Sequence, residues 1–209
     1  AVGIEVSSDR AASGAIYLDY LTWSGVPDLS LGVPASGGTM WQRAWVDAVD
    51  KVEKPKEGKL SYRLVQNHDT GLLIQGTREW TNYTFSAVVN PHLVKETGIA
   101  LCVQGLKRYY ALLLSDDGVI RLIKELDGRI VFAERESILD WDTDYSLSLG
   151  ISDATLTARI NGTLVFEHTD TDRPLLSGAV ALVCAAGRVD FGEVRVRPGK
   201  SEEAQISLH

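Results

Sequence analysis

Positive charge and long apolar runs are both scarce in this sequence. Its 21 Lys and Arg residues face 28 Asp and Glu residues, which gives a formal net charge of −7 and a pI near 5.1. A phosphate-binding surface needs a basic patch, so nucleic acid is not an expected partner. No apolar run approaches the roughly 20 residues that cross a bilayer, and the first residues lack the regions of a signal peptide. A membrane partner is not expected either.

Cysteine is also rare, with only Cys102 and Cys184 in 209 residues. Both lie inside apolar, strand-like runs, which is typical of buried free thiols that act as small hydrophobic side chains. A disulfide between them is the alternative, and it needs facing strands in an oxidising compartment. Neither residue has a Cys-x-x-Cys partner or a nearby His, so the pair does not indicate a metal site.

The sequence lacks the motifs of common hydrolases. A sugar-cleaving sandwich needs two carboxylates on opposite sides of the scissile bond, and no Glu-x-Asp-x-(x)-Glu run that would place them on one strand occurs. A Gly-x-Ser-x-Gly elbow, a His-Glu-x-x-His helix and a phosphate loop are missing as well. The Asp residues gather in turn-like segments, where Asp usually serves turn geometry. An independent enzyme is therefore not expected.

Hairpin turns are the strongest feature that is present. The segment from Arg108 to Glu134 holds two Asp-Gly pairs, Asp117-Gly118 and Asp127-Gly128, between apolar runs, and Asn161-Gly162 follows later. Such pairs favour type I′ turns because both central residues need φ > 0. The spacing predicts a three-stranded meander and a further hairpin in an all-β chain.

Two-residue loops at both Asp-Gly pairs predict the register of this meander. The facing residues are then Leu114 with Arg121, Ile123 with Phe132, and Arg121 with Glu134. Tyr110 falls on the same face as Arg121 under this register, because alternate residues of a strand share one face. Both faces carry apolar residues, so we expect the sheet to be covered on both sides.

Strand signals recur from Leu60 onward, with turn residues between them. We predict strands near residues 61–66, 71–76, 82–89, 97–104, 108–115, 119–125, 129–135, 145–151, 154–161, 163–168, 178–184 and 189–196. A dozen short strands at regular spacing are typical of a sandwich or jelly roll. The predicted fold is an all-β, two-sheet antiparallel jelly-roll sandwich.

The first 55 residues show a different pattern. Residues 1–34 contain two strand-like runs, and Leu29 to Val33 adds a third. A short helix is predicted after Thr39, with Trp41 and Trp45 on its apolar face as packing anchors. The chain starts inside a strand-like run without an initiator Met, so we expect a fragment of a longer protein.

A segment rich in Lys and Pro, residues 54–59, is the predicted domain boundary. It separates residues 1–55 from a sandwich over residues 56–199. The polar residues 200–209 are predicted to be a disordered tail.

Sugar binding requires aromatic faces for stacking and planar polar groups for hydroxyls. The residues of these types in suitable segments are Trp80, Tyr83, Gln104, Arg108, Tyr110, Arg121 and Trp141. A structural alternative is that Trp80 and Trp141 close the ends of the sandwich and Arg121 pairs with Glu134.

One acidic segment resembles a loose calcium loop. It contains Asp140, Asp142 and Asp144, and hard cations prefer several oxygen ligands. The segment lacks the Gly and the terminal Glu of an EF-hand. A structural calcium is therefore an expectation beside simple turn geometry, and no other cofactor is expected.

A family resemblance extends this interpretation. From about Leu72 to Arg197, the pattern LLIQG…W…Y.F, TGIALCVQGLKRYYALLLSDDGVIRLIKELDG and PLLSGAVALVCAAGRVDFGEVRV resembles a concanavalin A-like (laminin-G-like) jelly-roll domain. The N-terminal GIEVSSDRAASGAIYLDYLTWSG is similar to the last strands of a galactose-binding-like sandwich. Together they resemble the C-terminal part of bacterial proteins of the ADP-ribosylglycohydrolase family.

This resemblance implies an accessory module from a bacterial glycan- or ADP-ribose-processing protein, cytoplasmic or secreted. The expected partners are an oligosaccharide or sugar-like ligand and the catalytic domain of the parent. The helical catalytic part of that family uses carboxylates with magnesium, and nothing in this chain matches it. Two alternatives stay open: a glycoside hydrolase or lyase on the same fold, and a structural module that docks a helical hydrolase domain.

Overall fold

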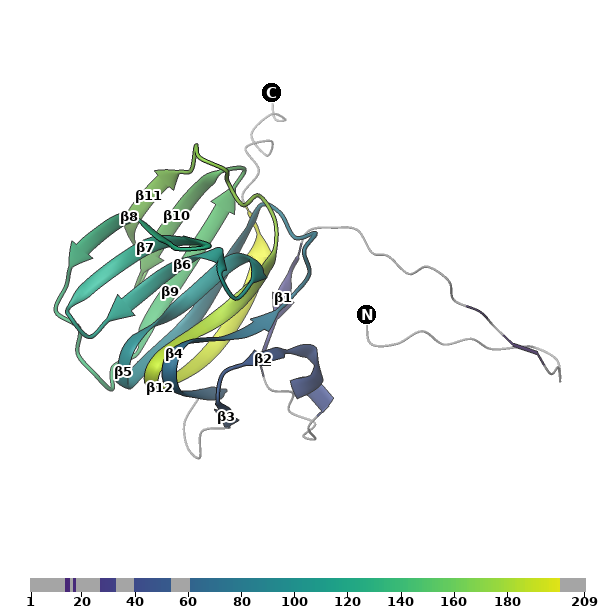
Figure 1. Cartoon of the computed structure of the whole chain (residues 1–209), viewed down its shortest axis with the longest axis horizontal. Helices are drawn as coiled ribbons and strands as arrows, with labels where there is room; N and C mark the ends of the chain where they lie inside the picture. Colours follow the sequence, from purple (N-terminus) through teal and green to yellow (C-terminus); the bar gives the residue numbers. More distant parts are fainter. Residues whose placement is uncertain (1–13, 16, 18–26, 33–39, 54–60, 200–209) are drawn as a thin grey trace, which may run out of the picture.

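The computed structural model describes residues 14–15, 17, 27–32, 40–53 and 61–199. Nearly all of its regular structure is antiparallel β (Figure 1). The elements are β1 (Leu29–Ser30), η1 (Met40–Ala44), β2 (Val46–Ala48), β3 (Lys51–Glu53), β4 (Tyr62–Gln75), β5 (Tyr83–Gly105), β6 (Arg108–Ser115), β7 (Val119–Leu126), β8 (Arg129–Glu136), β9 (Tyr145–Ser152), β10 (Thr155–Ile160), β11 (Thr163–Thr169) and β12 (Ala179–Pro198).

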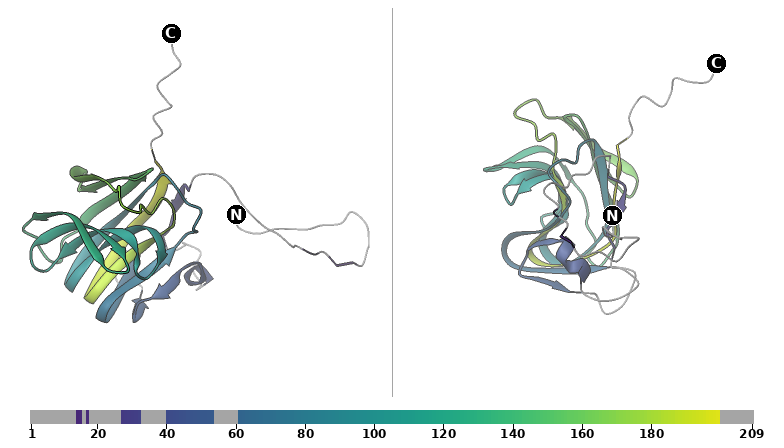
Figure 2. Two further views of the ribbon diagram at one scale, coloured as in Figure 1. Left: turned by 45° about the horizontal axis from the view of Figure 1, so that its top comes forward. Right: turned by 90° about the vertical axis from the view of Figure 1, so that its right-hand side faces the viewer.

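The strands form two layers that share three long strands (Figure 2). In the first layer the order is β11-β10-β9, then the N-terminal half of β5, the C-terminal half of β12, the N-terminal half of β4, and β3. In the second layer it is β8-β7-β6, then the other halves of β5, β12 and β4, and β2. The predicted antiparallel jelly-roll sandwich is confirmed.

The long strands differ from the prediction. β4, β5 and β12 were each expected as two short strands, but each is continuous and bends from one layer into the other. The bends coincide with register shifts, as at Ala186 and Gly187, whose φ angles are 44° and 151°. Small and polar residues occur at β-bulges as well as in turns. The sequence pattern therefore could not distinguish a bend within one long strand from a loop between two short strands.

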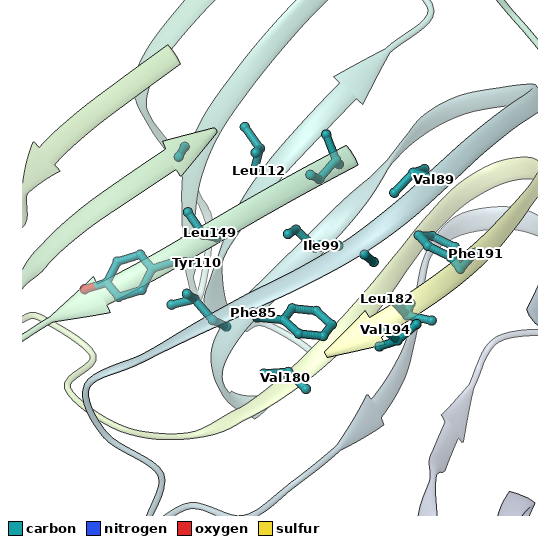
Figure 3. Close-up of a cluster of buried hydrophobic side chains, with 14 of the residues drawn as sticks. Phe85, Val89, Ile99, Tyr110, Leu112, Leu149, Val180, Leu182, Phe191 and Val194 are labelled. Atoms are coloured by element: carbon teal, nitrogen blue, oxygen red, sulfur yellow. The ribbon is translucent and has the colours of Figure 1, made fainter. Parts of the chain in front are cut away.

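The main hydrophobic core lies between the two layers (Figure 3). Phe85, Leu149 and Phe191 point inward from the first layer, and Tyr110 and Leu182 from the second, all fully buried. Burying each large apolar side chain contributes about 1.5–3 kcal/mol. This cluster therefore holds the two layers together.

The β6–β7 turn has a different length from the predicted one. Leu113 faces Arg121 and Leu114 faces Ile120, so the loop holds three residues, Asp116, Asp117 and Gly118. The Gly118 amide donates to the Ser115 carbonyl (3.1 Å) and Gly118 has φ 74°, which is the type I turn with a left-handed third residue. The predicted pairing of Leu114 with Arg121 is wrong.

This extra residue reverses the faces of β7 relative to β6. Tyr110 belongs to the main core cluster. Arg121 faces Leu113, which lies in the cluster on the opposite side of the layer. The prediction that Tyr110 and Arg121 share a face is therefore wrong, because a slip of one residue moves every side chain to the other face.

The other two hairpins agree better with the sequence, although Glu125 pairs with Arg129, so three residues lie between them at Asp127-Gly128 and the predicted two-residue loop is wrong. Arg121 faces Glu134 as predicted, but a register shift after Leu122 pairs Ile123 with Val131 instead of Phe132. Phe132 is the extra residue of this bulge. Asn161 and Gly162 lie at the predicted hairpin turn and form a two-residue loop, with φ angles of 49° and 79°.

The predicted N-terminal helix is reduced to the 3-10 turn η1. After it, Val46–Ala48 and Lys51–Glu53 are strands that pair with β4. Trp45 is buried, with its ring centroid 5.2 Å from that of Tyr62. Several predictions concern parts that lie outside the described residues. These parts are the side chain of Trp41, the domain boundary, the C-terminal tail and most of the N-terminal strands.

Two polar features lie inside the fold. Cys102 and Cys184 are free and buried, as predicted, and burial raises the pKa of each thiol to about 12. A buried ion pair joins Lys124 to Asp170, with Nζ 2.6 Å from Oδ2. The Tyr110 hydroxyl donates to the same carboxylate (2.5 Å), so this pair fastens the segment before β12 to β6 and β7.

Candidate functional site

A second apolar cluster covers the outer side of the second layer. Its members are Leu72, Ala100, Val103, Tyr109, Ala111, Leu113, Ile123, Ala179, Ala181 and Val183. They alternate along their strands with residues of the main core, so they point away from it. Even so, none of the ten is more than 6% exposed.

Arg129 lies on the same side of the layer as this cluster, because it faces Glu125, which faces Tyr109. Its Nε lies 2.8 Å from Glu125 on β7 and its Nη1 lies 2.9 Å from Glu96 on β5. Strands β7 and β6 separate β8 from β5, which is three spacings of about 4.8 Å in a flat sheet. The register also places Arg129 in the row of Tyr109 and Glu96 in the row of Ser115, at opposite ends of β6. The contact therefore requires a curved layer with Arg129 on its concave side.

The charges around Arg129 are mutually compensated. Burial acts to lower the pKa of Arg129, but the hydrogen bond that Arg129 donates to Glu125 and the charge of Glu96 outweigh it and raise that pKa. Burial also raises the pKa of the nearby Tyr109 hydroxyl, and the Glu125 carboxylate adds to that shift. The concave face thus carries an ordered ion-pair network over an apolar floor.

Arg121 forms a second charged group on this face. Its guanidinium donates to the Ser115 hydroxyl (2.9 Å) and to Asp117 (2.5 Å), and Glu134 lies 3.6 Å away. The hydrogen bond from Arg121 lowers the pKa of Asp117. Ser115 in turn donates to Glu96 (3.1 Å), so the two arginines belong to one network.

A hollow of about 420 Å³ opens at this network. We call it the charged hollow; its lining residues are Asp69, Thr70, Lys95, Glu96, Ser115, Asp116, Asp117, Arg121, Arg129, Ala185 and Ala186. The volume falls within the range of about 300–1,000 Å³ that is usual for small-molecule sites. Planar guanidinium and carboxylate groups in fixed positions suit a ligand with many hydroxyls.

A second hollow, of about 590 Å³, adjoins the first. We call it the Trp141 hollow; its lining residues are Ser115, Asp116, Asp117, Gly118, Val119, Glu136, Ser137, Ile138, Leu139 and Trp141. The two hollows share Ser115, Asp116 and Asp117. They therefore lie on either side of the β6–β7 turn.

The residues predicted as ligand contacts divide into separate groups. Arg121 lines the charged hollow and Trp141, 40% exposed, lines the adjoining one. Tyr110 is fully buried in the main core, and Arg108 is exposed at the start of β6. The β6–β7 turn thus brings together only two of the predicted residues.

The remaining three surround the start of β12. Tyr83 is fully buried and its hydroxyl donates to the Gly178 carbonyl (2.8 Å). Gln104 donates to the Ser177 carbonyl (2.9 Å), and the Trp80 ring packs edge-on against Tyr83 with centroids 6.1 Å apart. The hydroxyl of Tyr83 and the side-chain amide of Gln104 thus bind backbone carbonyls, and the Trp80 ring packs against Tyr83.

The carboxylates of two calcium candidates have protein partners, and the third candidate, Asp140, is held through its backbone. Asp142 contacts Nδ1 of His92, Asp144 accepts from the Asn90 amide (2.7 Å), and the Asp140 amide donates to Tyr145 (2.8 Å). Among the described residues no group of three or more His, Cys, Asp or Glu side chains is arranged to hold a metal ion. A calcium ion in this loop stays a prediction.

Glu96 and Arg129 are the site residues that the sequence analysis missed. They are 33 positions apart, and only the curvature of the layer brings them together. One signal was available: Arg129 follows Glu125 across the β7–β8 turn, and Glu96 stands directly before an apolar strand. A charged residue at such a position is buried only when it has a partner.

Comparison with known proteins places the fold but not the family. No protein-family model matches the chain, and no curated protein matches it in sequence. Among solved structures, a carbohydrate-binding module, CBM66 of Bacillus subtilis, superposes with a TM-score of 0.64 at 14% identity, over 74% of this chain and 95% of that module. A protein of unknown function with a galectin-like fold, also from Bacillus subtilis, gives 0.58 at 14% identity over 77% and 91%.

A third similar structure is domain 4 of AbnA, an extracellular arabinanase from Geobacillus stearothermophilus, in complex with arabinotriose. It gives a TM-score of 0.51 at 16% identity, over 74% of this chain and 81% of that domain. The chain shares the fold of these sandwiches. Within the described residues, no helix is long and apolar enough to cross a membrane.

Proposed function

We propose that this chain is a non-catalytic carbohydrate-binding module whose ligand lies in the charged hollow. The observation that supports it best is the arrangement of Arg121 and Arg129, both held by carboxylates around a hollow on the concave face. Several neighbours in fold are described as carbohydrate-binding modules or galectin-like domains, and one was solved with arabinotriose. A sugar-like ligand is consistent with both facts.

The geometry suits sugar recognition for a physical reason. Adjacent hydroxyls of a sugar donate to one carboxylate or accept from one guanidinium, and both groups are planar and bidentate. Here each guanidinium already has a partner, so the donors are oriented before a ligand arrives. Preorganised groups lose less entropy on binding.

The residues that line the charged hollow are more consistent with binding a sugar than with hydrolysing one. A general acid in a glycosidase needs a raised pKa, whereas Arg121 lowers the pKa of Asp117. We therefore assign no catalytic residue to this chain. The wider proposal, that it accompanies a hydrolase of the ADP-ribosylglycohydrolase type, rests on the sequence resemblance alone.

Calorimetric titration with neutral oligosaccharides tests the proposal. Arg121→Ala should weaken binding by about 1–3 kcal/mol through lost charged hydrogen bonds. Arg135→Ala is the matched control: Arg135 is exposed on the same meander and does not line the hollow. Folded wild-type protein that gives no heat with any sugar contradicts the proposal, and so does equal weakening by both variants.

A further inference from the structure

Resting on the proposed function, we infer that the site selects neutral sugar chains of at least two units. One unit occupies the charged hollow through hydrogen bonds. The next unit lies in the Trp141 hollow, against apolar side chains.

The charge of the first hollow disfavours acidic sugars. Four carboxylates line it against three cations. Arg121 is paired with Asp117, and Arg129 with Glu96 and Glu125. A uronate, sulfate or phosphate group that bound to either arginine would have to displace one of these partners, and throughout the hollow it would approach more carboxylates, which repel it, than cations. Neutral hydroxyls instead donate to and accept from the network as it stands.

The second hollow differs in chemistry from the first. Ile138 is 92% exposed and Trp141 is 40% exposed, beside Val119 and Leu139. An exposed Ile next to an exposed Trp is an apolar patch with no packing partner of its own. The apolar face of a sugar ring stacks on such a surface, as aromatic side chains in ligand sites do.

The segment that carries Trp141 is held on both sides. The Asp142 amide donates to the Pro91 carbonyl (2.8 Å), and its carboxylate contacts His92. On the other side, the Asp140 amide donates to the Tyr145 hydroxyl (2.8 Å). Because these contacts fix the backbone around it, the ring is positioned before a ligand binds, which lowers the entropic cost of stacking.

The two hollows meet at shared residues. Ser115, Asp116 and Asp117 line both, so a chain leaving the charged hollow passes over the β6–β7 turn into the second one. A single sugar ring in the charged hollow does not extend to Trp141. The length of the ligand therefore decides whether the second hollow contributes.

The test is a calorimetric series with mono-, di- and trisaccharides of glucose, galactose, xylose and arabinose, and with the matched galacturonate oligomers. For a sugar that binds, we expect the wild-type trisaccharide to bind about tenfold more tightly than the monosaccharide. Trp141→Ala and Ile138→Ser should remove that gain, so that the trisaccharide binds about as tightly as the monosaccharide. Arg121→Ala should weaken ligands of every length.

The two proposals fail in different ways. If neutral sugars bind but Trp141→Ala weakens all lengths equally, or if galacturonate oligomers bind more tightly than neutral ones, this inference is overturned while the proposed function stands. If no sugar binds to folded wild-type protein, both are overturned. Thermal melting of each variant shows that it is folded.

Discussion

Two charged side chains of opposite sign are buried inside this sandwich. Lys124 and Asp170 are 1% and 2% exposed, and Lys124 also donates to the carbonyls of Asp172 and Arg173. Removing one member of such a pair leaves the other buried without compensation, which is strongly destabilising. The pair is the most deeply buried ion pair among the described residues.

Asp170→Asn should lower the free energy of unfolding by about 3–5 kcal/mol, because it leaves the Lys124 charge buried and unpaired. Asp172→Asn is the control, since the Asp172 side chain is 80% exposed and should change stability by less than about 0.5 kcal/mol. Urea denaturation measures both. Equal, small losses would show that Lys124 is satisfied by the two backbone carbonyls.

Protonation of the Asp170 carboxylate should destabilise the folded protein at low pH. Burial acts to raise the pKa of Asp170, but the hydrogen bonds from Lys124 and Tyr110 outweigh it and lower that pKa. The Asp170 carboxylate therefore stabilises the folded state fully at pH values above the pKa of an unfolded Asp, about 3.9. This stabilisation is lost as the pH falls through the lower pKa that Asp170 has in the folded state.

Asp190 behaves in the same way. Its pKa is lowered by Arg63 and His92 against the effect of burial. We expect the free energy of unfolding to decrease as pH falls below about 4. Asp170→Asn should show a shallower decrease. Urea titrations between pH 3 and pH 6 measure it, and a stability that rises towards low pH would contradict the assignment.

At the scale of elements, the β6–β7 turn decides which face carries Arg121. Gly118 has φ 74°, a conformation that side chains with a Cβ rarely adopt. Gly118→Ala should cost about 1–2 kcal/mol. Gly105→Ala is the control, because Gly105 has no positive φ and nothing within 4 Å of an added Cβ. Denaturation of both variants measures the difference, and equal costs would argue against the left-handed turn.

The segment around Trp141 depends on a contact from β5. His92 contacts Asp142, and Nε2 of His92 lies 3.1 Å from Asp190. His92→Ala should free this segment while Arg63 still holds Asp190 (2.6 Å). We expect faster hydrogen exchange of the Asp142 amide and unchanged exchange in β10. Unchanged exchange at Asp142 would show that its backbone bond to Pro91 is sufficient.

At the scale of the whole molecule, the short strands before residue 54 complete the edges of the layers. β2 and β3 pair with β4, and β1 pairs with β12. Trp45 joins them to the core by packing against Tyr62. The division of the chain at residue 55 stays a prediction, but these strands already share the sheet with the sandwich.

Trp45→Ala should therefore lower the free energy of unfolding by about 3–5 kcal/mol, as for other buried tryptophans. Gln42→Ala, at an exposed position of η1, should have little effect. Thermal or urea unfolding of the full chain compares them. An unchanged transition for Trp45→Ala would mean that residues 40–53 contribute little to the fold.

The sequence by itself determined the class of fold and the places where the chain turns. Asp117-Gly118, Asp127-Gly128 and Asn161-Gly162 all lie at hairpin turns, because few residues tolerate positive φ and local geometry alone selects them. The burial of both cysteines followed from their apolar neighbours for a similarly local reason.

Only the tertiary structure decided the register, the continuity of the long strands and the composition of the site. One additional loop residue placed Arg121 on the concave face, and no local preference distinguishes the two loop lengths at an Asp-Gly pair. Glu96 and Arg129 meet across the two strands between them, β6 and β7, because the layer curves. Curvature arises from twist and bulges summed over the whole sheet, so no single segment of the sequence contains it.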